Sequence, residues 1–295
     1  MSSVPERRRS VRVVDGMLEV HDFAAASPDA AVVLALAGTT GNGLAWGRLA
    51  DSLGGDVRVL APDLRGRAGS AVLPSRGLES HVGDLVAVLD DLAVDRVVVV
   101  GHSIGAFVAA LLAKRHPERV SAAVLVDGGL PFVPKTDEMV ETIVAGLAQR
   151  LQVRLPSAEA HLDLWREHPG MKAVLADDPN ERVMRFLAHD LAEAPDGLIA
   201  SSYRIDALRA DMRDMVHNAE LHDAVRSHVV PTTVLWAPRD LNDAAGGMYD
   251  DAALDALGLP DDVVRRSVPD TNHYSIVLGS AGAAVIAEAL RAAVG

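Results

Sequence analysis

The amino-acid sequence predicts an α/β fold with a mostly parallel sheet. Residues 30–126 alternate short Val-, Leu- and Ala-rich runs with amphipathic stretches, a pattern typical of buried parallel strands joined by crossover helices. This alternation stops after residue 129 and resumes near residue 232, so the residues between them form an insertion of another class. The chain has 295 residues, of which 49% are hydrophobic and 23% charged, enough to bury a large core.

The sheet is expected to begin with an antiparallel hairpin and to continue with parallel strands. Residues 10–14 and 17–23 flank Asp15-Gly16, a dipeptide that favours a tight turn between two strands. Further strands are expected at 31–37, 57–61, 96–100, 122–126, 232–236 and 263–268. Apolar residues at helical spacing predict covering helices at 46–53, 78–92, 106–114 and 281–293. The eight strands would form one sheet flanked by helices.

The insertion is expected to be helical throughout. Its candidate helices are residues 136–151, 157–168, 180–191 and 205–218, and no strand is predicted among them. We therefore expect a core domain of residues 1–130 and 228–295, with residues 131–227 inserted as a helical cap.

Composition excludes several function classes. The 28 Lys and Arg residues against 41 Asp and Glu residues leave a net charge of −13, which opposes binding to nucleic acid or to anionic lipid. With no cysteine, the chain has no disulfide, thiolate nucleophile or Cys-based metal site. No apolar run is long enough to span a membrane, and the basic N-terminus is not followed by a signal-peptide core. We expect a cytoplasmic protein that acts on a small molecule, and nothing in the sequence indicates its oligomeric state.

The most informative motif is Gly101-His-Ser-Ile-Gly105, which follows a predicted strand and precedes a predicted helix. A nucleophile on a sharp strand-to-helix turn lies in strained backbone, and close neighbours leave no space for side chains beside it. Glycine on both sides meets that need. The motif therefore predicts Ser103 as a nucleophile.

With this motif the chain resembles the α/β-hydrolase superfamily, specifically its serine hydrolases with a helical cap. The stretch Asp63-Leu-Arg-Gly-Arg-Ala-Gly-Ser70 and the stretch His116-Pro-Glu-Arg-Val120 are also similar to segments of that family. The resemblance implies an eight-stranded, mostly parallel sheet and an enzyme without a cofactor. Asp63, Arg65 and His116 belong to structural signatures and are expected to have no catalytic role.

The resemblance also implies an oxyanion hole made of two backbone N–H groups. One belongs to Ile104, directly after the nucleophile, and the other to Thr39 in the loop after the third strand. That loop departs from the family's pattern, because Ala37 stands where a His is usual. The hydroxyl groups of Thr39 and Thr40 are further candidate donors.

Ser103 needs a general base, and His is the residue type best matched to that task. His273 follows the last predicted strand, where the family carries its base. His102 is expected to point away from the nucleophile. The other His residues of the insertion and its edges are expected to be solvated or to cap helices; they are His161, His168, His189, His217 and His222.

The acid that orients His273 has three candidates. Asp240 follows the strand 232–236, at the station that the family uses most often, and is our first choice. Asp127 follows the strand 122–126 and is the alternative, because some branches place the acid there. Asp243 is the third candidate.

No metal site is predicted. His217 and His222 lie five residues apart and do not share the helix face of a His-Glu-x-x-His zinc site.

The expected function is hydrolysis of a carboxylic ester, thioester or lactone of small or medium apolar character through an acyl-enzyme, with specificity set by cap residues such as Trp165 and Phe186. Alternatives are a C–C hydrolase, a perhydrolase-type haloperoxidase or a lyase of the same fold, and a non-catalytic ligand receptor.

Overall fold

The computed structural model describes residues 3–131, 136–178 and 181–295. Within these residues, eight strands form one sheet in the order β1-β2-β4-β3-β5-β6-β9-β10. The strands are β1 (Glu6–Val13), β2 (Gly16–Phe23), β3 (Val32–Leu36), β4 (Arg58–Pro62), β5 (Val97–His102), β6 (Val120–Val126), β9 (Thr232–Trp236) and β10 (Val264–Ser267). This confirms the predicted sheet.

The first two strands form the predicted hairpin. Val13 pairs with Gly16 across a turn in which Asp15 has a φ of 74° and Gly16 a φ of 154°. β2 also pairs antiparallel with β4, and the remaining neighbours pair parallel. The central strands β5 and β6 are almost wholly buried because helices cover both of their faces.

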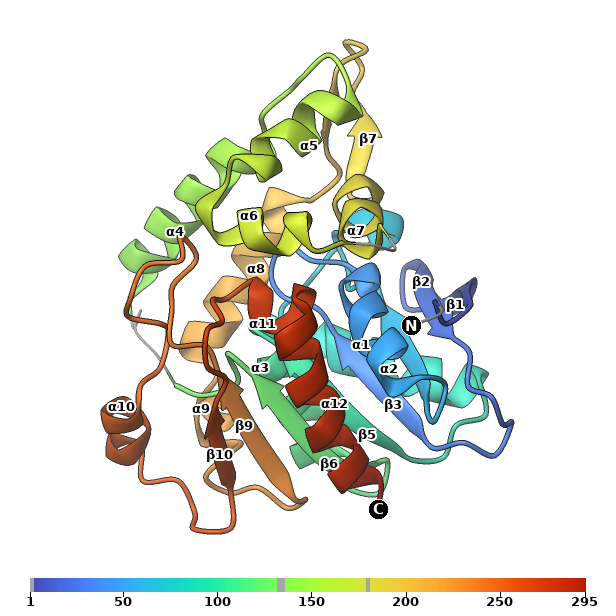
Figure 1. Cartoon of the computed structure of the whole chain (residues 1–295), viewed down its shortest axis with the longest axis vertical. Coiled ribbons are helices and arrows are strands. Elements are labelled where there is room, and N and C mark those ends of the chain that lie inside the picture. The colour runs from blue at the N-terminus through green and yellow to red at the C-terminus, as the bar shows by residue number, and fades with distance from the viewer. Residues whose placement is uncertain (1–2, 132–135, 179–180) are drawn as a thin grey trace.

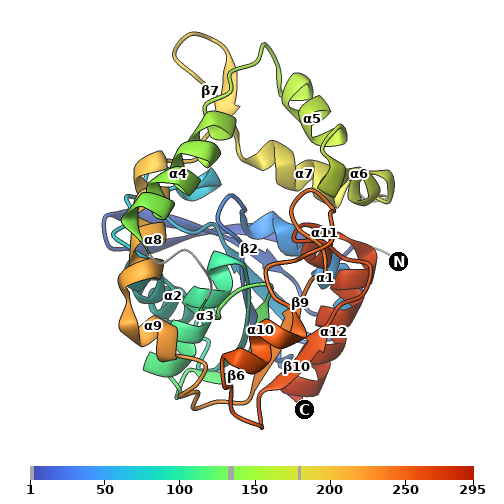
Figure 2. The same ribbon diagram turned by 90° about the vertical axis from the view of Figure 1, so that its left-hand side faces the viewer.

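Two helical layers cover the sheet, as Figure 2 shows. One face carries α2 (Leu78–Asp91) and α3 (Ile104–Arg115), and the other carries α1 (Gly47–Leu53) and α12 (Ser280–Val294). Each layer encloses its own hydrophobic cluster, in which Leu85 and Leu111 pack on one side of the sheet and Leu49 and Ile286 on the other. Among the described residues, no helix combines the length and apolarity that crossing a bilayer requires.

The segment inserted between β6 and β9 lies over one end of the sheet (Figure 1). Its helices are α4 (Asp137–Leu151), α5 (Ala158–Arg166), α6 (Pro169–Ala176), α7 (Arg182–His189), α8 (Ile205–His217) and α9 (Ala219–Asp223). Thr136 and Ser157 cap α4 and α5 by accepting hydrogen bonds from Met139 N and Ala160 N. The helix predicted at 180–191 is found as α7, although Asn180 lies outside the described residues.

The expectation of an insertion without strands is wrong. Residues Leu191–Glu193 (β7) and Ile199–Ser201 (β8) pair as a small antiparallel ribbon. Each strand has only three residues, too few to show a period of two, but Pro195-Asp196-Gly197 is a turn signal between them. The helices α6, α9, α10 (Asp251–Ala256) and α11 (Ser275–Leu278) were also not predicted, since short helices carry little periodicity.

Candidate active site

Ser103 lies at the turn between β5 and α3, as predicted. Its backbone has a φ of 54° and a ψ of −122°, a conformation that is strained for a residue with a side chain. A Cβ atom on Gly101 would lie 2.2 Å from the carbonyl oxygen of Gly105, and one on Gly105 would lie 2.3 Å from that of Leu36. Only glycine fits at either position, which explains the flanking glycines of the motif.

The structure brings His273 to Asp127. The His273 Nδ1 atom lies 2.6 Å from Asp127 Oδ2, and Asp127 Oδ1 accepts a hydrogen bond of 3.2 Å from Ala237 N. The Asp127 side chain is 1% exposed, and the residue has a φ of 46° directly after β6. A buried carboxylate in this position holds the imidazole in one orientation and selects the tautomer protonated on Nδ1.

The preference for Asp240 as the partner of His273 is therefore corrected in favour of the alternative, Asp127. Asp240 Oδ1 accepts hydrogen bonds from Asn242 N at 2.8 Å and Ala244 N at 2.9 Å, so this carboxylate closes its own loop. Asp243, the third candidate, does not reach His273 either. Its Oδ1 accepts a hydrogen bond of 3.0 Å from Asn272 Nδ2 and its side chain pairs with Arg239.

One sequence signal could have favoured Asp127, namely the glycine that follows it. A Cβ atom on Gly128 would lie 2.3 Å from the carbonyl oxygen of Ser103. The turn after β6 therefore passes directly against the nucleophile turn, because β5 and β6 are neighbours in the sheet. No comparable glycine immediately follows Asp240.

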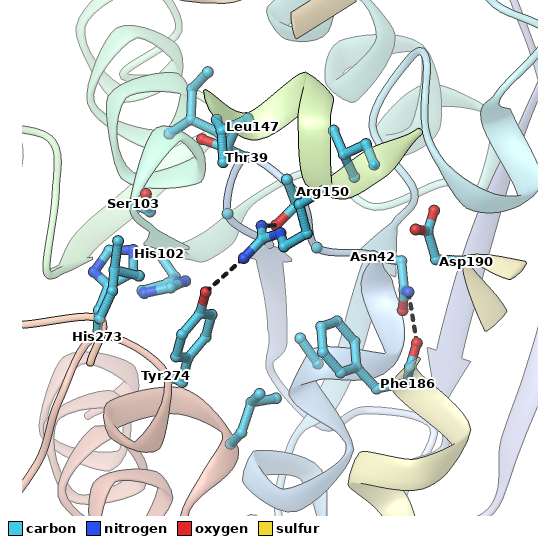
Figure 3. Close-up of a pocket in the computed structure, with 18 of the residues that line it drawn as sticks. Thr39, Asn42, His102, Ser103, Leu147, Arg150, Phe186, Asp190, His273 and Tyr274 are labelled. Carbon is cyan, nitrogen blue, oxygen red and sulfur yellow. Dashed lines mark hydrogen bonds between the residues drawn. The ribbon is translucent and has the colours of Figure 1, made fainter. Parts of the chain in front are cut away.

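His102 departs from expectation. Instead of pointing away, it lines the same cavity as Ser103, and its ring centroid lies 4.5 Å from that of His273. Figure 3 shows the three residues together at one end of the cavity. Burial and the neighbouring His273 hold the pKa of His102 well below its usual range. A neutral His102 therefore packs against the proposed base.

The two residues expected to supply oxyanion donors line this cavity as well. Ile104 is the first residue of α3, where backbone N–H groups have no partner within the helix, and Thr39 lies in the loop after β3. Asn42 lies in the same loop and also lines the cavity. Its Nδ2 donates to the carbonyl oxygen of Phe186 in α7 at 2.9 Å, which ties the loop to the inserted segment (Figure 3).

The cavity between the sheet and the inserted helices has a volume of about 470 Å³. Its wall is mainly apolar, with Phe107, Leu147, Trp165 and Phe186 among the lining residues. Asp190 lines the cavity too, and burial raises the pKa of its carboxyl group even though Ser201 and Ser202 donate hydrogen bonds to it. Such a cavity suits a small or medium organic molecule.

Arg150 is a cavity residue that the sequence did not single out. Its guanidinium donates to Tyr274 Oη at 3.1 Å and to Thr40 Oγ1 at 3.2 Å, and it lies 5.1 Å from the Trp165 ring centroid (Figure 3). The hydroxyl oxygen of Thr40 is thus an acceptor here. Arg150 stands in an ordinary amphipathic helix pattern, so no local signal marks it.

The structure agrees with some of the remaining expectations for single residues and contradicts others. Asp63 accepts hydrogen bonds from Gly43 N and Gly69 N, and Arg65 forms a two-pronged pair with Asp84, which matches their structural interpretation. The expectation of solvated or capping His residues is wrong for two of them. His161 is buried and lies 2.6 Å from the carbonyl oxygen of Ile199, and the His189 side chain is only 9% exposed.

Comparison with known proteins agrees with the fold. The sequence model of a family described as "alpha/beta hydrolase fold" matches residues 31–280, more than four fifths of the chain. The chain is 39% identical over 129 residues to the lipase LipV of Mycobacterium tuberculosis, covering 43% of this chain and 48% of that protein. It is 30% identical over 184 residues to a putative non-heme haloperoxidase of Mycobacterium phage D29, covering 62% of each. The chain thus matches about half to three fifths of the length of these curated relatives.

A solved structure extends the likeness to nearly the whole chain. The crystal structure of E-2-(acetamidomethylene)succinate hydrolase superposes with a TM-score of 0.77 over 98% of both chains, at 19% sequence identity. At that identity the likeness concerns the fold.

Proposed function

Because the chain belongs to the α/β-hydrolase family, we propose that it is a serine hydrolase that cleaves a carboxylic ester, thioester or lactone through an acyl-enzyme. The observation that carries the proposal is the 2.6 Å contact between His273 Nδ1 and Asp127 Oδ2, beside the cavity that Ser103 also lines. The 39% identity to a protein named a lipase supports ester chemistry.

In the proposed reaction Asp127 accepts the Nδ1–H of His273, which leaves His273 Nε2 as the proton acceptor. Ser103 Oγ attacks the carbonyl carbon while Nε2 takes the hydroxyl proton. The backbone N–H groups of Ile104 and Thr39 stabilise the negative charge on the carbonyl oxygen. The leaving alcohol or thiol takes the proton from His273, and water then repeats the sequence to release the acid.

We also propose that residues 131–227 act as a cap domain that encloses the acyl group. The cavity wall that these residues supply is mostly apolar, which favours an apolar acyl group and excludes water from it. Trp165 and Phe186 are the large side chains of the cap in this wall.

Turnover of p-nitrophenyl esters by purified protein tests the reaction. Replacing Ser103 with Ala should lower the rate by at least about 10³-fold, because only binding and the oxyanion donors then remain. Ser227→Ala is a matched control, since its hydroxyl is exposed and bonded to Lys114 and Asp223. A Ser103→Ala variant that keeps more than a tenth of the wild-type rate would refute the nucleophile.

The identity to a putative haloperoxidase favours a second candidate reaction, in which peroxide replaces water as the attacker of the acyl-enzyme. An enzyme of that kind would form a peracid from hydrogen peroxide and an organic acid, the peracid would oxidise added bromide, and the oxidised bromine would brominate a dye. This activity would be lost in Ser103→Ala. C–C cleavage or a lyase reaction would leave p-nitrophenyl esters uncleaved. Labelling of Ser103 by a fluorophosphonate without turnover of any ester, C–C or lyase substrate would indicate a ligand receptor.

A further inference from the structure

A second group of chemically capable side chains lies at the junction of the sheet and the cap. Glu19, His21, Asp63 and His189 each offer one potential ligand atom, and these four atoms lie within 4.8 Å of one another. None of the four residues is among those that line the substrate cavity. The proposed hydrolysis therefore does not use them.

The pairing of β2 with β4 brings three of the residues together. Val20 pairs with Pro62 and His21 with Ala61, and Asp63 N donates a hydrogen bond of 2.9 Å to the carbonyl oxygen of Glu19. Residues 19 and 21 are two apart on one strand and so share a face. The fourth residue, His189, ends α7, and its ring packs edge-on against the ring of His21 at 4.9 Å.

The distances between the potential ligand atoms suit a single small ion. His189 Nε2 lies 2.8 Å from Asp63 Oδ2 and 3.2 Å from Glu19 Oε1. His21 Nε2 lies 3.3 Å from Asp63 Oδ1 and 3.6 Å from Glu19 Oε1. Four ligands at tetrahedral angles around a zinc ion with bonds of about 2.0–2.1 Å lie about 3.3 Å apart.

The surroundings of His21 point its free nitrogen into this group. His21 is fully buried, and its Nδ1 lies 2.8 Å from Glu6 Oε1. Since a carboxylate only accepts, Nδ1 carries a hydrogen toward Glu6, and Nε2 faces Asp63 and Glu19. Within the described part of the chain, neither His21 Nε2 nor Glu19 Oε1 makes a hydrogen bond, although both atoms are buried.

Glu6 thus accepts a hydrogen bond from the ring nitrogen of His21 that faces away from the proposed ion. Carboxylates commonly orient metal-bound His residues in this way in other metalloproteins. Arg185 in turn donates to Glu6 Oε2 at 2.7 Å, which fixes the carboxylate.

We propose that Glu19, His21, Asp63 and His189 form a structural site for Zn²⁺ that ties α7 of the cap to the sheet. Four protein ligands with none left open are typical of structural rather than catalytic zinc. An ion bound to His189 Nε2 takes the place of the hydrogen between this nitrogen and Asp63 Oδ2, and that proton goes to solvent. The proposal departs from the expectation from the sequence, which predicted no metal site and rejected His217 and His222 as a zinc pair.

Zinc binding by the full chain, stripped with EDTA and dialysed, tests the proposal. Equilibrium dialysis with elemental analysis should find one Zn²⁺ per chain in the wild type, and Zn²⁺ should raise its melting temperature. His189→Gln should abolish both effects. His116→Gln is the control and should change neither the bound Zn²⁺ nor the rise in melting temperature. His116 is partly exposed, pairs with Glu118 and is not one of the four proposed ligands.

Glu6→Gln provides a second test that keeps all four ligands. It should weaken zinc affinity about 10- to 100-fold, as loss of an outer carboxylate does. Co²⁺ in place of Zn²⁺ should give the strong visible absorption of four-coordinate cobalt. The proposal is overturned if the wild type binds no stoichiometric Zn²⁺, if His189→Gln binds it equally well, or if Co²⁺ shows only the weak spectrum of six-coordinate ions.

Discussion

Among single residues, Asp127 decides most about the proposed chemistry. Its carboxylate reaches His273 because the residue follows β6 in a left-handed turn with a φ of 46°, and because β6 lies next to β5, which carries the nucleophile. Asp240 and Asp243 follow β9, the strand beside β6, but they bond to their own loop and to Asn272. Asp240 and Asp243 are nearer to His273 in the sequence than Asp127 is, so distance along the chain did not identify the carboxylate that contacts His273.

Replacing Asp127 with Asn should lower the kcat for ester hydrolysis by about 10⁴-fold, as in a serine protease whose triad acid is changed in the same way. The amide keeps the size but favours the wrong tautomer of His273 and removes the charge that stabilises its imidazolium form. Asp240→Asn and Asp243→Asn are matched controls and should lose much less. A collapse of kcat in Asp240→Asn alone would show that Asp127 is not the acid.

The lowered pKa of His102 leads to a prediction of how the free energy of unfolding depends on pH. Its pKa is lowered in the folded protein, so the unfolded chain binds a proton below pH about 6.5 that the folded chain does not bind. The stability that neutral His102 contributes is present above that pH and is lost as the pH falls toward the folded pKa. Over that range the free energy of unfolding should fall by up to about 1.4 kcal/mol per pH unit more in the wild type than in His102→Asn.

Urea unfolding of both proteins between pH 7 and pH 5 measures this difference. His228→Asn serves as the control, because His228 lies away from the cavity and pairs with the exposed Asp262. Equal pH dependence in the wild type and His102→Asn would contradict a neutral His102.

Between elements, buried charged side chains join helices of the inserted segment to the rest of the chain. Arg182 of α7 pairs with Asp51 of α1 at 2.6 Å, and Arg67 after β4 pairs with Asp211 of α8 at 2.6 Å. Asp211 is fully buried and also accepts hydrogen bonds from Ser75 and His81. Such ion pairs fix the position of a helix, because a buried charged side chain is destabilising unless it contacts a group of opposite charge.

Replacing Asp211 with Ala should therefore lower the free energy of unfolding by about 3–5 kcal/mol, since Arg67 is left buried without its counter-charge. The exposed pair of Arg166 with Asp163 in α5 supplies the control, and Asp163→Ala should cost less than about 1 kcal/mol. Urea unfolding gives both values. A loss below about 1 kcal/mol in Asp211→Ala would mean that the joint between α8 and the core does not depend on this pair.

For the whole molecule, the inserted segment and the sheet share their hydrophobic packing. Val140 and Leu208 of the insertion belong to the same buried cluster as α2 and α3, and Val183 and Leu187 belong to the cluster of α1 and α12. The cavity lies where these layers meet. Its shape therefore depends on side chains from both parts of the chain.

Side chains of the proposed cap should set the preference for acyl length. Phe186→Ala and Trp165→Ala enlarge the cavity and should shift kcat/KM toward longer acyl chains by roughly tenfold, the effect of one or two methylene groups in an apolar pocket. Val72→Ala, on an exposed surface away from the cavity, is the control. Rates with p-nitrophenyl esters of increasing length measure the shift, and an unchanged order in both cavity variants would refute this role of the cap.

Much of the fold could be predicted because its signals are local. Runs of buried β-branched residues mark the strands, the dipeptide Asp15-Gly16 marks the hairpin, and long amphipathic patterns mark the helices. The ribbon of β7 and β8 and the helices α6, α9, α10 and α11 were missed, since short elements leave little periodic pattern to read.

By itself the sequence determined the strand, turn and helix around Ser103, because glycines at 101 and 105 are demanded by contacts within a few residues of the turn or with the adjoining strand. It also marked His273, which follows the last strand. Only the tertiary structure decided that Asp127 meets His273, that Arg150 enters the cavity, and that Glu19 and His189 meet beside Asp63. These contacts join segments up to 170 residues apart (189 − 19), and their geometry depends on strand order and cap packing, which no local pattern encodes.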